Sequence, residues 1–267
     1  MYNCDSEIVV KYLFSRTIQQ IASLIYFLLY SSKLIRLNLV DTIYIKLYLL
    51  YKSKIESFDL EFLKNYLKGT ITVIDVGSNV GYFTISIAKY LDNTSKILSI
   101  EPSEQNIIRM KKVLKHRTIV QKIEIVKAGA SDSNNVGYLK IDQKNPSNNQ
   151  ISSIKEGCVE IKLLTLDSIC SGIGDIGLVK IDVQGYELKV LQGATKLIAE
   201  QLPILLIEID NRISSLLALN LWDFLTQHSY FIFLIDGKKK TLTRQEIAGQ
   251  KGYFDIFCIH KSKYVYG

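Results

Sequence analysis

Apolar positions change their spacing along the chain near Gly69. Before it they recur every three or four residues, which predicts helices over residues 9–37, 40–51 and 59–67. After it, short apolar runs alternate with amphipathic stretches, a pattern typical of βαβ units and a mostly parallel sheet. The sequence therefore predicts N-terminal helices followed by an α/β domain.

Seven apolar runs are predicted to form the core sheet. They span residues 71–76, 96–100, 123–128, 178–183, 204–209, 230–235 and 254–260. Helices are expected over residues 82–90, 104–115, 186–198 and 216–227. The last two runs are expected to pair antiparallel at the sheet edge. Alternating segments 137–143 and 158–164, joined by a polar loop, predict an inserted β-hairpin.

Composition and charge fit a folded protein and narrow its partners. Of the 267 residues, 48% are hydrophobic, which is enough to bury a full core. The formal net charge is +7, but the basic residues are spread along the chain. The one tight cluster, 238–240, follows Asp236 and Gly237 and is interpreted as a solvated hairpin tip, with phosphate or headgroup contact as the alternative. Nucleic acid is therefore not the expected partner.

The four cysteines are widely separated and form no C-x-x-C pair. They are Cys4, Cys158, Cys170 and Cys258. The expected state is free thiols packed as small apolar groups in a reducing compartment, which favours a cytoplasmic protein.

An uncharged stretch, residues 17–32, lies near the N-terminus. It is shorter than the roughly 20 residues that a spanning helix needs. The segment before it contains Asp5 and Glu7 and lacks the basic region of a secretory signal. A helix packed on the domain or on a partner is favoured. Peripheral membrane contact through the N-terminal helices is the alternative, because Lys33 and Arg36 suit anionic lipid.

A glycine turn that begins with an acid follows the first predicted strand. It reads Asp75-x-Gly77-x-Asn79-x-Gly81, whereas a dinucleotide loop reads G-x-G-x-x-G. An acid here would repel a pyrophosphate. The loop therefore suits a ligand with a cationic or zwitterionic end, such as the amino acid portion of S-adenosylmethionine, with an ordinary turn of small residues as the alternative.

Two further candidates follow the second and third strands. Glu101 lies 26 residues after Asp75, near the roughly 20-residue offset at which an acid reaches ribose hydroxyls. By accepting two hydrogen bonds, Glu101 would anchor the sugar. The alternative is that Glu101 only caps the helix after Pro102. Ser131 and Asp132 lie where an adenine edge is expected, and an Asx turn explains them equally well.

A second charged motif ends the fourth strand. Strand alternation places Lys180 and Asp182 on one side, and the turn at Gly185 brings Glu187 back over the strand end. Charges inside an apolar strand are costly unless they are paired or functional. A Lys180–Glu187 ion pair is the structural alternative, whereas Asp182 is expected to face the mouth of a pocket.

Carboxylates also end the fifth strand, at Glu208 and Asp210. Together with Asp182 they would suit a substrate hydroxyl or a hard cation such as Mg²⁺. Strand-end acids more often bind polar substrate or cap the next helix, so no metal site is predicted and Mg²⁺ is the less favoured alternative.

These motifs resemble the FkbM family of S-adenosylmethionine-dependent methyltransferases. The resemblance runs from about Glu56 to the last strand, and the residues that carry it are 73–84, 100–102, 165–167 and 179–194. Gln184 stands where the family often has Glu. The resemblance divides the chain into an N-terminal helical extension, residues 1–55, and an FkbM-type methyltransferase domain, residues 56–267.

The resemblance implies a class I methyltransferase fold, with a Rossmann-like, seven-stranded, mostly parallel sheet and an antiparallel last strand. It also implies S-adenosyl-L-methionine as cofactor and methyl transfer to oxygen, commonly a hydroxyl of a sugar, glycan or other small metabolite. The candidate cofactor-binding residues are Asp75, Gly77, Ser78, Asn79, Gly81, Tyr82, Glu101, Pro102, Ser131 and Asp132. In the hypothesis for catalysis, Asp182 orients or accepts the acceptor proton, Glu208 aligns the substrate, and Lys180 or Glu187 fixes the loop.

Two other functions stay open. A nicotinamide-dependent oxidoreductase uses a related sheet, but the missing G-x-G-x-x-G counts against it. A noncatalytic scaffold or membrane-tethered partner would keep the fold without turnover, and the intact Asp75, Glu101 and Asp182 count against that. The sequence alone predicts neither the acceptor nor the oligomeric state.

Overall fold

The computed structural model describes most of the chain in two compact units. The described residues are 24–25, 27–29, 31–34, 38–55, 63–119, 121–142, 148–212, 214–235 and 241–264. One unit is Met1–Asp59 with Ile141–Asn149, and the other is Leu60–Lys140 with Gln150–Gly267. The predicted boundary between residues 55 and 56 stays a prediction.

The described part of the first unit contains helix α2 (Asn38–Ile55). Most of the uncharged stretch 17–32 and all of the basic cluster 238–240 lie outside the described residues, so both interpretations stay predictions. None of the helices described here combines the length and the apolar character needed to span a membrane.

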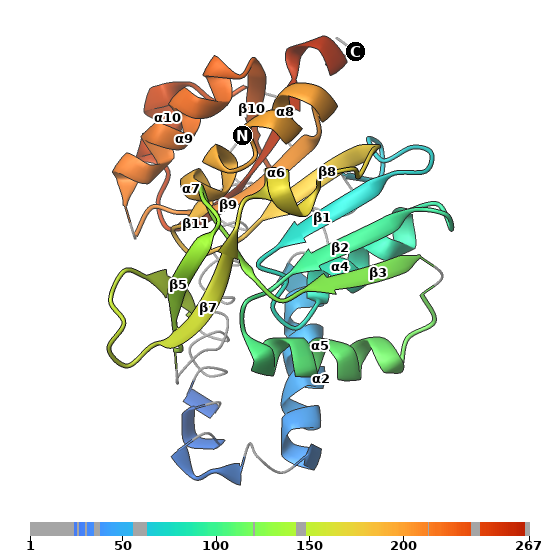
Figure 1. Cartoon of the computed structure of the whole chain (residues 1–267), viewed down its shortest axis with the longest axis vertical. Helices are drawn as coiled ribbons and strands as arrows, with labels where there is room; N and C mark the ends of the chain where they lie inside the picture. The colour runs from blue at the N-terminus through green and yellow to red at the C-terminus, as the bar shows by residue number, and fades with distance from the viewer. Residues whose placement is uncertain are drawn as a thin grey trace, which may run out of the picture. The chain divides into compact units, whose positions relative to one another are not determined.

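The second unit is built on a seven-stranded sheet in the order β10-β11-β9-β8-β1-β2-β3 (Figure 1). Its strands are β1 (Thr72–Val76), β2 (Lys96–Ile100), β3 (Lys122–Val126), β8 (Ile176–Ile181), β9 (Ile204–Asp210), β10 (Tyr230–Leu234) and β11 (Tyr253–His260). Strands β1, β2, β3, β8 and β9 pair parallel to one another, and β11 runs antiparallel to both of its neighbours, β9 and β10. The predicted mostly parallel sheet with an antiparallel last strand is therefore confirmed.

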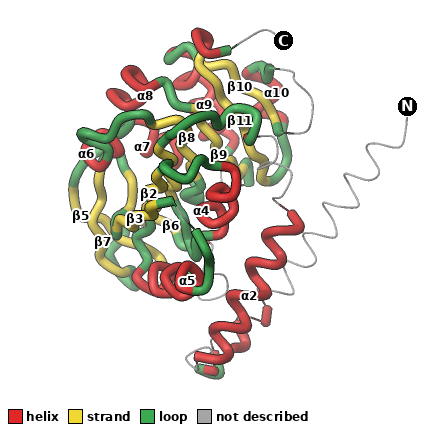
Figure 2. Tube along the Cα trace, turned by 90° about the vertical axis from the view of Figure 1, so that its right-hand side faces the viewer, coloured by secondary structure: helices red, strands yellow, loops and turns green. Residues whose placement is uncertain are grey.

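Helices cover both faces of this sheet, as the views in Figures 1 and 2 show. They are α4 (Tyr82–Ile87) with the 3-10 turn η2 (Ala88–Tyr90), α5 (Glu104–Lys115), α6 (Leu166–Ile169), α7 (Glu187–Gln192), α8 (Thr195–Gln201), α9 (Ser215–Gln227), α10 (Arg244–Gly249) and the 3-10 turn η4 (Lys261–Lys263). On one face Leu191 and Leu221 belong to the same core as Ile74. On the other face Phe83 belongs to the same core as Val73.

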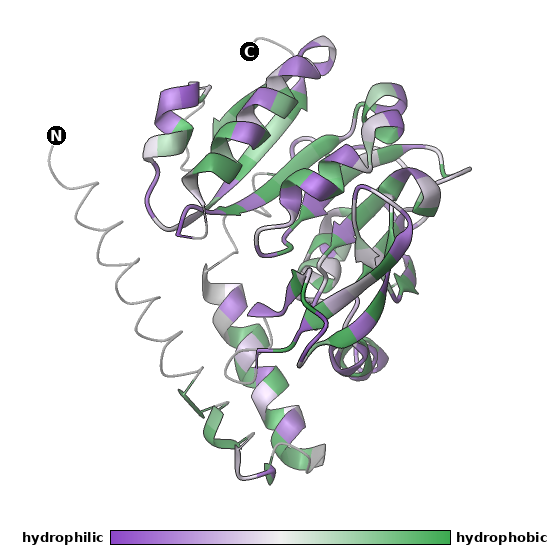
Figure 3. Cartoon of the chain, turned by 60° about the vertical axis from the view of Figure 1, so that its left-hand side comes forward, coloured by the Kyte–Doolittle hydropathy of each residue, from purple (hydrophilic) through white to green (hydrophobic). Residues whose placement is uncertain are grey.

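Because both faces are covered, the central strands are hydrophobic along most of their length (Figure 3). Every residue of β1 is buried. Asp75 is the one charged residue within that strand, and it is fully buried at 0% exposure. Such a group needs compensating partners, which makes the end of β1 the place to look for a functional site.

The inserted hairpin is confirmed and is part of a second, four-stranded sheet in the order β4-β7-β5-β6. Strands β5 (Asn135–Lys140) and β7 (Val159–Leu164) pair antiparallel. Two short strands, β4 (Gly129–Ala130) and β6 (Gln150–Ser152), extend the sheet on either side.

The single helix predicted over residues 186–198 is wrong, because it breaks at Gly193 into α7 and α8. A Cβ at Gly193 would lie 1.9 Å from the carbonyl oxygen of Ser131, so the chain approaches too closely there for a side chain. Asp167 then caps α8 by accepting the N–H groups of Lys196 and Leu197 at 3.1 and 2.8 Å. Helix α10, with a capping box at its start, was not predicted.

Candidate active site

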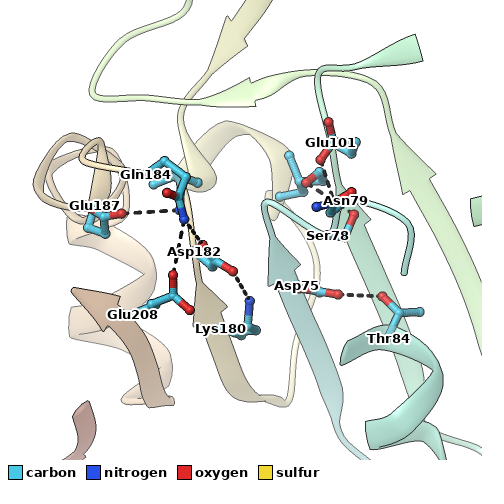
Figure 4. Close-up of polar contacts among 12 residues, drawn as sticks. Asp75, Ser78, Asn79, Thr84, Glu101, Lys180, Asp182, Gln184, Glu187 and Glu208 are labelled. Carbon is cyan, nitrogen blue, oxygen red and sulfur yellow. Dashed lines mark hydrogen bonds and ion pairs between the residues drawn. The ribbon is translucent and has the colours of Figure 1, made fainter. Parts of the chain in front are cut away.

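The end of β1 buries Asp75 in a small polar network. Thr84 donates its hydroxyl to Asp75 Oδ2 at 2.6 Å and lies 2.7 Å from the hydroxyl of Ser99 (Figure 4). Asp75 Oδ1 is buried without a hydrogen-bond partner among the described residues. Burial raises the pKa of Asp75, and the neighbouring Lys180 opposes that rise. This carboxylate can therefore accept one further donor.

The glycine loop after β1 alternates through the left-handed region. The φ angles are +77° at Gly77, +51° at Asn79 and +82° at Gly81. A Cβ at Gly77 would lie 1.9 Å from the main-chain oxygen of Asp182. A Cβ at Gly81 would lie 2.8 Å from Cγ of Met110, so that glycine makes room for α5. Both glycines are thus required by packing inside the domain.

Glu101 follows β2 and faces this loop, with 4% of its surface exposed. Its Oε2 accepts the N–H of Asn79 at 2.9 Å. Its Oε1 accepts the N–H of Ser103 at 2.9 Å and the side-chain amide of Asn106 at 3.3 Å. Since a carboxylate has about four lone-pair directions, one is left for a ligand hydroxyl, where the sequence predicted two. Two of these donors belong to the start of α5, whose N-cap is Ser103, so the cofactor role and the capping role of Glu101 both stay predictions.

Glu101 also predicts a pH dependence of stability. Burial raises its pKa from 4.5 to about 7, against the three donors. Between these two values the folded protein keeps a proton that the unfolded chain releases, so the free energy of unfolding falls as the pH rises through this window. In the Glu101→Gln variant, the free energy of unfolding should therefore fall by roughly 2 kcal/mol less over this pH window. Urea denaturation at pH 5 and pH 8 checks this, and an unchanged difference between the two pH values would contradict it.

The second charged motif forms a connected cluster at the ends of β8 and β9. Lys180 Nζ lies 3.2 Å from Asp182 Oδ2 and 5.5 Å from the centre of the Phe83 ring. The amide nitrogen of Gln184 donates to Asp182 Oδ1 at 3.0 Å and to Glu208 Oε1 at 3.2 Å (Figure 4). Lys180 therefore forms an ion pair with Asp182.

Glu187 holds the turn that carries this cluster. It is 2% exposed, and its Oε1 accepts the N–H groups of Val183 and Gly185 at 3.3 and 3.0 Å. Burial raises the pKa of Glu187 to about 7. The carboxyl of Glu187 thus holds the loop after β8 in its turn conformation by accepting hydrogen bonds from the main chain.

The two halves of the site meet directly. The N–H of Asp182 donates to the carbonyl of Val76 at 3.1 Å. Asp75 and Lys180 are register partners on adjacent strands, and their side chains are neighbours in Figure 4. The carboxylates predicted from separate motifs are therefore gathered at one edge of the sheet.

Some of the predicted residues lie elsewhere or face other partners. Asp132 accepts from Ser131 at 3.0 Å and pairs with Lys189 at 2.5 Å, which lowers the pKa of Asp132. The adenine role of Ser131 and Asp132 stays a prediction. Asp210 binds Arg212 through two hydrogen bonds of 2.8 and 2.6 Å and so is engaged by the turn after β9.

Three further predicted positions belong to the first half of the site. Ser78 is buried in the loop after β1, and its N–H donates to the carbonyl of Ile100, the last residue of β2, at 3.2 Å. Tyr82 is buried at the start of α4, and Pro102 is half-buried beside Glu101.

Thr84, Ser99 and Asp255 were not predicted as site residues from the sequence. Asp255 is the register partner of Glu208, and directly opposed residues share a face of the sheet. The available signal was a charged residue inside an otherwise apolar strand. In the part of the chain that is described, no group of three or more His, Cys, Asp or Glu residues is arranged to hold a metal ion.

Comparison with known proteins identifies relatives of this architecture. The model of the methyltransferase FkbM domain matches residues 75–232, more than half of the chain. No curated protein sequence matches. Among solved structures, the chain is similar to a methyltransferase FkbM from Methylobacillus flagellatus, with 20% identity and a TM-score of 0.52 over 83% of this chain. The chain spans about half of that protein, 54% of its length.

Two further solved structures match with lower scores. A precorrin-6y C5,15-methyltransferase from Geobacter metallireducens has 11% identity and a TM-score of 0.48, covering 77% of this chain and 88% of that one. An S-adenosylmethionine-dependent O-methyltransferase from Thermotoga maritima has 10% identity and a TM-score of 0.47, covering 80% and 67%. With the motifs, the sheet order and the domain match taken together, the chain belongs to the methyltransferase FkbM family.

Proposed function

We propose that this protein transfers a methyl group from S-adenosylmethionine to a hydroxyl oxygen of a sugar, glycan or other small metabolite. The observation that carries the proposal is the position of Asp182. Its main chain touches the loop at Gly77, while its carboxylate, 19% exposed, is held by Lys180 and Gln184. The carboxylate that we propose as proton acceptor thus lies beside the loop that we propose to bind the cofactor.

The first half of the site fits the cofactor. Asp75 Oδ1 is a buried acceptor without a partner among the described residues, which suits the ammonium of the amino acid portion. Glu101 keeps one lone-pair direction for a ribose hydroxyl. The loop from Gly77 to Gly81 would lie against the ligand. When bound, the cofactor supplies an electrophilic methyl group on a sulfonium.

The second half is suited to hold an acceptor hydroxyl. Asp182 would accept a hydrogen bond from that hydroxyl and then its proton. The ammonium of Lys180, 3.2 Å from Asp182 Oδ2, would hold this carboxylate in place. Glu208 would align a second polar group of the acceptor. Positioning of this kind is the main contribution required of the protein.

Ligand binding tests the class of cofactor. S-adenosylhomocysteine should raise the melting temperature of the full chain by mass action, whereas NAD should leave it unchanged. A response to NAD alone would indicate an oxidoreductase. A response to neither, confirmed by calorimetry, would favour the noncatalytic scaffold and overturn the proposal.

The Asp182→Asn variant tests the proton acceptor. We expect its affinity for S-adenosylhomocysteine to stay within a few fold and methyl transfer to fall about 10²-fold, since the amide cannot take the proton. Transfer is measured with labelled S-adenosylmethionine and a panel of free and lipid-linked oligosaccharides. Asp223→Asn, which breaks the exposed pair with Arg244, is the control. Equal rates in the two variants would remove Asp182 from this role.

A further inference from the structure

Two carboxylates, those of Asp182 and Glu208, are held to one amide nitrogen on the acceptor side of the site. Ile181 and Ile207 are register partners on the parallel strands β8 and β9, so the next residues, Asp182 and Glu208, also lie side by side. Their nearest oxygens are bound to one nitrogen at 3.0 and 3.2 Å and are therefore no more than about 6 Å apart. At that separation two negative charges repel by about 3 kcal/mol at an effective dielectric constant near 20.

Gln184 supplies the group between them. Its side-chain nitrogen has two protons, and the two hydrogen bonds direct one to Asp182 and one to Glu208. The other oxygen of Asp182 faces Lys180. Asp182 is thus held from both sides, once by a charge and once by a neutral amide.

A strained backbone conformation places this amide. Gln184 has φ +54°, a conformation that is unfavourable for a residue with a side chain, and Gly185 follows with φ +98°. The turn is maintained by Glu187, which accepts the N–H groups on either side of Gln184, those of Val183 and Gly185. A strained residue held by a buried carboxylate indicates a functional requirement at that position.

We infer that Gln184 is a positioning residue whose amide bridges Asp182 and Glu208 and takes the role that a bound metal ion would otherwise have, keeping both carboxylates ionised and correctly spaced. This inference rests on the proposed function in one respect, since it concerns the residue assigned as proton acceptor. Gln184 itself takes no proton. Its contribution is to fix the spacing and the charge of the two carboxylates that face the acceptor.

The test is a pH titration of the carboxylates in the full chain, monitored by carbon-13 NMR on protein labelled at Asp and Glu. Gln184→Glu removes both donors and adds a negative charge at nearly the same shape, on a face that also carries Asp255, the register partner of Glu208. The midpoint at which the Asp182–Glu208 pair takes up a proton should then rise by at least about one pH unit. Gln192→Glu, an exposed position at the end of α7, makes the same chemical change in solvent and should leave the midpoint unchanged.

The Gln184→Gly variant distinguishes the effect of the side-chain amide from the effect of the backbone conformation. Glycine accepts the positive φ, so this variant should fold at least as well as the native chain and still show a raised midpoint, smaller than that of Gln184→Glu. Midpoints in both Gln184 variants equal to that of the native protein would overturn the inference. Tight Mn²⁺ binding at the native pair, seen as broadening of the Asp182 and Glu208 signals, would also overturn it. Neither readout requires the cofactor, so the result is independent of whether S-adenosylhomocysteine binds.

Discussion

Gly77→Ala is expected to lower the affinity for S-adenosylhomocysteine by at least about 100-fold and the free energy of unfolding by about 3 kcal/mol. The new Cβ would lie 1.9 Å from the carbonyl oxygen of Asp182, which is main chain and cannot rotate away. Either the loop or the end of β8 must shift. Both halves of the site would then lose their geometry through one methyl group.

A matched control separates the clash from the backbone conformation. Gly172 has the same φ, +77°, but a Cβ there would meet nothing within 4 Å. Gly172→Ala should therefore cost about 1 kcal/mol and leave ligand binding unchanged. Calorimetry with S-adenosylhomocysteine and urea denaturation of both variants give the comparison. If the two substitutions behaved alike, the close approach of Gly77 to Asp182 would not be what requires glycine.

The meeting of the two motifs was predictable from sequence because of a general property of parallel sheets. Strands β1 and β8 both run in the same direction, so their carboxyl ends lie at one edge. An acid and a glycine turn after each apolar run then suffice to predict a shared site. The alternation of apolar runs and amphipathic helices predicted the seven strands in the same way.

Other features depend on contacts that the local sequence does not contain. The break at Gly193 is imposed by the main chain of Ser131, which reaches it from the inserted sheet. Asp255 joins the face of Glu208 only through the register of β11 on β9. The side chain of Gln184 points to both carboxylates because of a positive φ that residue type alone does not predict. These are long-range or conformational facts, and the last two concern the acceptor side of the site.

Lys180→Met should lower the free energy of unfolding by about 3–5 kcal/mol, because it removes the cation from a pair that is largely buried. Lys180 and Asp182 have side chains only 11% and 19% exposed, and the fully buried Asp75 also interacts with Lys180. The methionine keeps an apolar stem against Phe83, so the loss measures charge more than packing. Urea denaturation at pH 7 gives the value.

Two comparisons distinguish this effect from a general loss of charge. Lys189→Met breaks the Asp132 pair, whose side chains are 46% and 31% exposed, and should cost no more than about 1 kcal/mol. Without Lys180, the buried carboxylates are easier to protonate, so the difference from the native protein should shrink as the pH is lowered from 7 to 5. The double variant Lys180→Met with Asp182→Asn should recover part of the loss, because one buried negative charge disappears. Equal effects of the two lysine substitutions would mean that water, not Lys180, compensates the charges of Asp75 and Asp182.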